Sequence, residues 1–145
     1  MRLIAILFMA IAACFSCKKE TGGNELDGKW KMTQYYDRNT SSFHSKPDTS
    51  MDVFLVIDGI KFTAYSGTHT ICHGGYFLLD DNISFNTINP IVPNDNWTDM
   101  FLRAIEACKP TAALNCIPSK LEKPSPNQIR INTSLWMDII FTKVR

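Results

Sequence analysis

The segment His69-Thr70-Ile71-Cys72-His73 holds the densest group of side chains that could bind a metal or act in catalysis. On a strand, His69 and His73 share a face but lie about 13 Å apart, at about 3.3 Å per residue, and Cys72 points to the opposite face. Zn²⁺ holds its nitrogen ligands at about 2 Å, and a nucleophilic cysteine needs its base within hydrogen-bond reach. The spacing therefore favours neither a metal site nor a Cys–His pair.

The remaining candidates for acid–base chemistry are few. His44 lies in the polar stretch 37–50, which we expect to be a loop, and Asp80-Asp81 is typical of a turn. No carboxylate occurs within five residues of either His69 or His73 to orient it. We therefore predict that the protein is not an enzyme, with no catalytic residues, no metal site and no cofactor.

A different chemistry is expected at the N-terminus, where a thiol could accept a lipid. Met1-Arg2 is followed by thirteen mostly apolar residues, Leu3–Phe15, then by Ser16-Cys17 and the charged Lys18-Lys19-Glu20. This is the layout of a secretory signal peptide, and the apolar run is shorter than the roughly 20 residues that span a bilayer. A small residue followed by Cys indicates a bacterial lipoprotein signal over residues 1–16, with the lipid on Cys17.

Cys14 is the alternative lipidation site. Ile11-Ala12-Ala13-Cys14 fits the usual pattern of an aliphatic residue, small residues and Cys. The charged residues after Cys17, however, resemble those of surface-directed lipoproteins of some Gram-negative bacteria. We therefore favour Cys17 and expect the protein in the cell envelope, lipid-anchored at the outer membrane, with residues 17–25 as a lipidated Cys and short tether.

Lipidation at Cys17 leaves three cysteines in the mature chain. An exported protein meets an oxidising compartment, so we expect a disulfide between Cys108 and Cys116, with Cys72 as an alternative partner for either.

Charge excludes one class of partner. The chain has 15 basic and 14 acidic residues, and because Arg2 lies in the signal the mature part has 14 of each. A nucleic-acid-binding surface would require a basic excess, so no nucleic-acid partner is expected.

Residues 26–145 have the pattern of one antiparallel β domain. Short strands are expected over 29–36, 52–57, 60–64, 70–79, 83–85, 128–132 and 135–144, with a hairpin at Asp58-Gly59 and a bulge at Gly74-Gly75. This spacing predicts a small β-barrel or sandwich. One helix is expected near residues 95–107, because Trp97, Phe101 and Ile105 recur at helical spacing after a capping residue, Asn94 or Asp95.

Two small β families resemble this chain. Leu26-Asp27-Gly28-Lys29-Trp30 is similar to the first strand of the META-domain (HslJ-like) family, and Gly-x-Trp also opens lipocalin-like proteins. The segments 62–67 and 83–85, Gly75-Tyr76, a helix over 100–107 and a closing strand at 140–143 follow in the META order. The resemblance implies a non-enzymatic, stress-associated protein of the envelope.

Two functions follow as expectations. The first is a non-catalytic envelope lipoprotein that acts through its surface, with a protein partner. The alternative is a lipocalin-like carrier that binds a small apolar molecule in a cavity lined by Trp30, Tyr76 and Trp136.

Overall fold

The structure, a computed structural model, describes residues 25–145 apart from residues 89, 108–118 and 134. These residues form strands and one helix in the chain order β1 (Gly28–Asp37), β2 (Ser42–Ser45), β3 (Val53–Asp58), β4 (Lys61–Ser66), β5 (His69–Leu79), β6 (Asn82–Ile88), α1 (Asn96–Glu106), β7 (Ser119–Ser125), β8 (Gln128–Asn132) and β9 (Met137–Val144).

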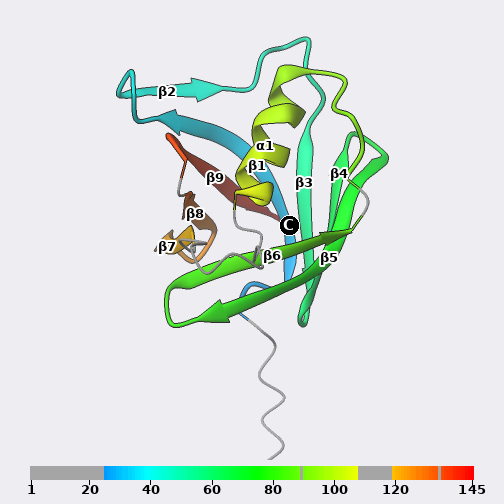
Figure 1. Ribbon diagram of the computed structural model, residues 1–145, viewed down its shortest axis with the longest axis vertical. Helices are drawn as coiled ribbons and strands as arrows, with labels where there is room; N and C mark the ends of the chain where they lie inside the picture. Colours follow the sequence, from blue (N-terminus) through cyan, green and yellow to red (C-terminus); the bar gives the residue numbers. More distant parts are fainter. Residues whose placement is uncertain (1–24, 89, 108–118, 134) are drawn as a thin grey trace, which may run out of the picture.

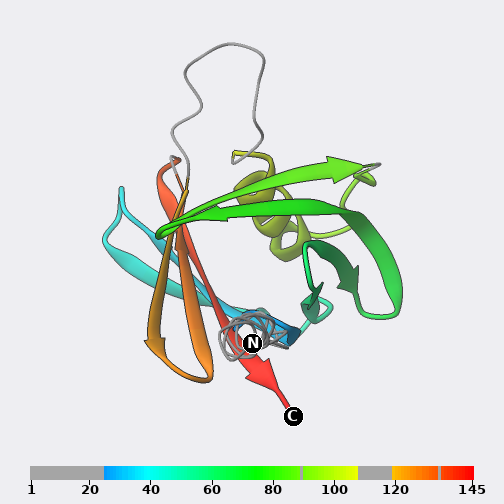
Figure 2. The ribbon, with the colours of Figure 1, turned by 90° about the horizontal axis from the view of Figure 1, so that it is seen from below.

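Eight of these strands close into an antiparallel barrel (Figures 1 and 2). The order is β1-β3-β4-β5-β6-β7-β8-β9, and β9 returns to β1 along nearly its whole length, from Lys29 opposite Val144 to Asp37 opposite Met137. Strand β2 pairs with the second half of β1 and extends beyond the ring (Figure 1). The prediction of a barrel or sandwich is thus confirmed as a closed barrel.

The chain enters the barrel at one end, and helix α1 covers the other. The entry end carries residues 26–28 and the β3–β4 turn, since the Asp27 carboxylate accepts a hydrogen bond from the Gly59 N–H at 2.9 Å. At the helix end, Thr98 of α1 bonds Ser66, the last residue of β4, at 3.0 Å between their hydroxyl oxygens. Figure 1 shows α1 at the end of the barrel opposite the start of β1.

Helix α1 forms where the apolar stripe predicted it. Asp95 is the N-cap, and its carboxylate accepts from the N–H groups of Trp97 and Thr98 at 2.9 and 3.0 Å, which satisfies donors that the first turn leaves unpaired. The buried face then packs on the barrel interior, with the Phe101 ring edge-on to Phe141 at 6.1 Å between centroids.

Aromatic and aliphatic side chains fill the barrel interior. Because strand residues alternate between faces, every second residue of β3 and β9 points inward, as do Trp30 and Met32 of β1 before the register shift at Thr33, and the helix adds its own stripe. The largest fully buried side chains are Trp30, Trp97, Phe62, Phe85, Phe101, Phe141, Leu26, Met32, Leu55, Ile71, Ile83 and Ile105.

Several local expectations were wrong. The two turn residues between β3 and β4 are Gly59 and Ile60, one position later than the expected Asp58-Gly59. The stretch 37–50 is not all loop, because β2 lies within it. Strand β7 was missed: Pro124 weakens its strand pattern, and in the structure this proline sits at a register shift between Glu122 and Ser125, where no ladder donor is needed. The bulge in β5 lies at Ile71, between Thr70 and Cys72, and the ladder through Gly74 and Gly75 is regular.

Position 74 requires glycine for a reason other than a bulge. A Cβ atom at this position would lie 1.8 Å from the Asn86 carbonyl oxygen of β6. Glycine is therefore required because the two backbones approach too closely for any side chain.

Candidate functional site

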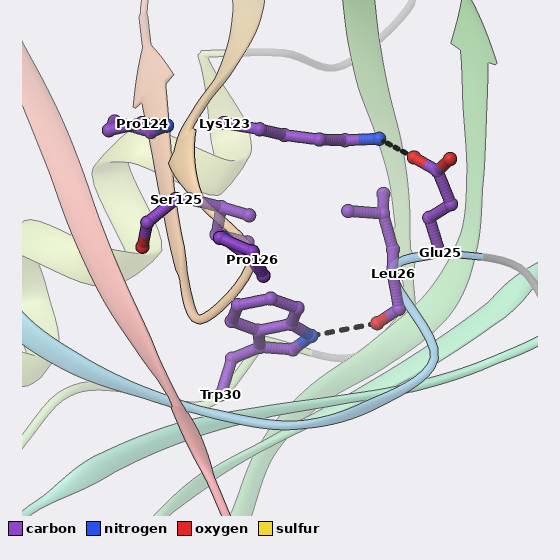
Figure 3. A pocket seen from close by; sticks show the side chains of 8 residues that line it. Glu25, Leu26, Trp30, Lys123, Pro124, Ser125 and Pro126 are labelled. Atoms are coloured by element: carbon purple, nitrogen blue, oxygen red, sulfur yellow. Dashed lines mark hydrogen bonds and ion pairs between the residues drawn. The ribbon is translucent and has the colours of Figure 1, made fainter.

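A pocket of about 530 Å³ opens at the entry end of the barrel. It lies between the start of β1 and the tip of the β7–β8 hairpin (Figure 3). Its lining residues are Glu25, Leu26, Trp30, Lys123, Pro124, Ser125, Pro126 and Ile129. Barrel closure brings these two segments together, although they are about a hundred residues apart in the sequence.

Two contacts hold the N-terminal segment across this pocket. The Trp30 Nε1–H donates to the Leu26 carbonyl oxygen at 2.7 Å, and Lys123 forms an ion pair with Glu25 (Figure 3). Hydrogen bonding to Lys123, and then its charge, lower the pKa of the Glu25 carboxyl. The ion pair is exposed, so it orients the segment more than it stabilises the fold.

The pocket suits a small apolar group. Its volume lies within the range of ligand sites, about 300–1,000 Å³, and its lining includes Pro124 and Pro126. Leu26, Trp30 and Ile129 at its base are buried against the core. An occupant would therefore contact chiefly the hairpin tip and the aliphatic part of Lys123.

The three residues expected to line one cavity lie in different places. Trp30 lines the pocket. Tyr76 is buried beside Phe85, and its hydroxyl donates to the Gly59 carbonyl oxygen at 2.9 Å. Trp136 is partly buried and packs on the core at the start of β9. Sequence reasoning missed Leu26, Pro126 and Ile129, because their proximity depends on the β7–β8 hairpin.

His69 and His73 are both exposed, and Cys72 is buried in the core. The expectation that the two histidines share a face was wrong, because the bulge at Ile71 places His69 opposite the buried Ser66 and His73 opposite Thr63, which faces outward. Within the described residues, no three His, Cys, Asp or Glu side chains gather closely enough to hold a metal ion. Cys14, Cys17, Cys108 and Cys116 lie outside the described residues, so their lipidation and pairing stay predictions.

His44 belongs to the β1–β2 hairpin and not to a loop. Its ring stacks on Tyr35 at 4.6 Å between centroids, and Nε2 lies 2.9 Å from the Ser42 hydroxyl. The Asp37 carboxylate accepts backbone N–H groups of Asn39 and Thr40 in the turn. These contacts shape the hairpin.

A polar cluster around Asp138 lies on the outer face of β8 and β9. The Asp138 side chain is only 3% exposed, and its two oxygens lie 3.0 Å from Arg38 and 2.6 Å from Arg130. Arg38 also donates to the carbonyl oxygens of Thr133 and Met137. The carboxylate thus joins the end of β1 to the β8–β9 connection.

Among the described residues, no helix has the length and apolar character needed to cross a lipid bilayer.

Comparison with known proteins gives structural neighbours only. No protein-family model and no curated protein match the chain. It is similar to the NMR structure of a protein from Burkholderia xenovorans, with 16% identity and a TM-score of 0.55, over 84% of this chain and 89% of that one. It is also similar to the crystal structure of an uncharacterized protein from Bacteroides eggerthii, with 18% identity and a TM-score of 0.50, over 81% of this chain and 98% of that one. At these identities the likeness shows a shared fold and nothing about activity.

Proposed function

We propose that the protein is a non-catalytic lipoprotein of the cell envelope, anchored through Cys17 at the outer membrane and acting as a partner-binding module. The packed barrel interior is the observation that supports binding through the outer surface. Large side chains of β1, β4, β6, β9 and α1 occupy the space that an enclosed ligand would need. A barrel that is full inside interacts through its surface.

The sequence supports the anchor. Only seven residues separate Cys17 from Glu25, the first described residue, and Leu26 is already part of the core. The opening Leu26–Trp30 resembles families that imply a non-enzymatic envelope protein. A barrel placed directly after a lipidated Cys would stand close to the membrane.

Replacing the acceptor thiol tests the anchor. We expect the wild-type protein and a Cys14→Ser variant in the membrane fraction of cell lysates, because both keep the Cys17 thiol. A Cys17→Ser variant should lose the lipid, which radiolabelled fatty acid incorporation would measure. Labelling of Cys17→Ser together with loss of label in Cys14→Ser would move the anchor to Cys14. If neither the wild-type protein nor either variant incorporated the label, the result would contradict lipidation.

The carrier function is the second candidate, and the pocket beside Trp30 favours it. We expect native mass spectrometry of the chain from Lys18 onward to show the polypeptide mass alone, because the base of the pocket is packed. A stoichiometric extra mass would instead favour the carrier, if Pro126→Asp in the pocket wall removes it and Pro47→Asp, which changes an exposed proline outside the pocket, does not.

A further inference from the structure

Large apolar side chains are exposed together beside the entry end. Ile60 in the β3–β4 turn is 76% exposed, and Phe77 and Leu79 near the end of β5 are 68% and 74% exposed. We call these three residues the apolar edge. Contiguous exposed apolar surface of this kind marks an interaction site more often than scattered single residues do.

Backbone contacts bring the apolar edge together. The Tyr76 N–H donates to the Ile60 carbonyl oxygen at 3.0 Å, which places Phe77 directly beyond the turn. Strand β4 begins at Lys61 opposite Gly75, so residues 77–79 of β5 extend past β4 and pair only with β6. Because Tyr76 points into the core, Phe77 and Leu79 point outward.

An open groove of about 480 Å³ continues the apolar edge along β4 and β5. Ile60 stands at its margin, and Gly74 and Gly75 contribute no side chains to its floor. Ile60 belongs to both the groove and the apolar edge, while Lys61, Thr63, Thr70 and His73 give the rest of the groove polar walls.

The apolar edge is next to the point where the chain enters. Asp27, which directly precedes β1, bonds Gly59, the neighbour of Ile60, at 2.9 Å. Residues 17–25 span at most about 28 Å at about 3.5 Å per residue. A lipid on Cys17 therefore keeps the apolar edge within reach of the same bilayer.

We propose that the apolar edge rests in the interface of the anchoring membrane, with Ile60, Phe77 and Leu79 among the lipid headgroups and upper acyl chains. This inference depends on the lipid anchor proposed above. Apolar and aromatic side chains bind this interfacial layer, and the short tether raises their local concentration there. The helix end and the β1–β2 hairpin then face away from the membrane, as the surface presented to partners.

Tryptophan fluorescence tests this orientation on the lipidated full-length protein in phosphatidylethanolamine–phosphatidylglycerol vesicles. Phe77→Trp places a reporter on the apolar edge, and Phe43→Trp is the matched control, since Phe43 on β2 is 57% exposed away from the entry end. The emission of the wild-type protein, from Trp30, Trp97 and Trp136, is subtracted. We expect the remaining emission from Trp at position 77 to shift to the blue and to be quenched when the lipids carry brominated acyl chains. Emission from position 43 should match that of the same variant in solution.

The outcomes separate the inference from the anchor beneath it. Mass spectrometry of the same preparation first shows whether the N-terminus carries lipid, and its absence would overturn both. With lipid present, an unquenched position 77, or equal quenching at both positions, would overturn the orientation alone. A blue shift at position 77 that grows with protein concentration in an unlipidated chain starting at Lys18 would instead identify a second copy as the occupant and overturn the membrane contact.

Discussion

A Gly74→Ala variant should lose about 3 kcal/mol or more of its free energy of unfolding, near or above the upper end of what overpacking commonly costs. The added methyl group would lie 1.8 Å from the Asn86 carbonyl oxygen and 2.9 Å from the carbonyl carbon. These are backbone atoms in the adjacent strand, so no side-chain rotation relieves the clash. Strands β5 and β6 must separate over a ladder that runs from His73 opposite Ile88 to Leu79 opposite Asn82. Urea unfolding followed by tryptophan fluorescence measures the change.

Gly75→Ala is the matched control for that experiment. The nearest atom to a Cβ at Gly75 is the Ile60 carbonyl oxygen at 3.5 Å, an ordinary contact. We expect its unfolding midpoint to stay close to wild type or to rise, because alanine restricts the unfolded chain more than glycine does. Equal midpoints for the two variants would show that β5 and β6 are not as close as the structure has them.

An Asp138→Asn variant should lose about 3 kcal/mol of its free energy of unfolding. The carboxylate is nearly inaccessible, and its two oxygens face Arg38 and Arg130. An amide of the same shape removes the negative charge and turns an N–H₂ group toward a guanidinium. Removing one partner of a buried ion pair costs about 3–5 kcal/mol, and we take the lower end because both arginines are partly exposed.

Asp99→Asn provides the comparison for Asp138. Asp99 pairs with Arg103 one helical turn away on the surface of α1, at 2.7 Å, and such pairs contribute about 0.3–0.5 kcal/mol. Thermal unfolding at low and high salt separates the two cases, because screening weakens the surface pair much more than the buried one. If Asp138→Asn lost no more stability than Asp99→Asn, the result would contradict the structural role assigned to the cluster around Asp138.

The sequence was most informative where alternation or helical spacing was strong. The strands around Trp30, Leu55, Phe62 and Ile131, and the helix after Asp95, all form close to where they were expected. Their inward residues are apolar at the correct period, so local pattern and burial agree. The hairpin was found too, although its two turn residues are Gly59 and Ile60, one position later than the Asp58-Gly59 signal.

The errors came from places where tertiary contacts override the local pattern. Strand β2 is short and polar and forms because it pairs with β1. Strand β7 contains Pro124 and charged residues and forms because β6 and β8 flank it. Gly74 resembles a bulge residue in sequence, yet its role depends on the backbone of Asn86, which no local pattern shows.

The pocket was predicted only in part. Trp30 was identified from its size and position in the first strand, but its neighbours at the tip of β7–β8 reach it only when the barrel closes. The apolar edge was missed for a related reason. Phe77 and Leu79 were placed only within the strand expected over 70–79, and only the strand register shows that this part of β5 extends past β4.

Mass spectrometry of the N-terminal peptide of the protein, purified from the membrane fraction, tests the lipid anchor most directly. We expect the mature chain to begin at Cys17, with a diacylglycerol on its thiol and an acyl chain on its amino group. A chain that still begins at Met1, or a processed chain without lipid, would contradict the anchor and with it the function proposed for this barrel.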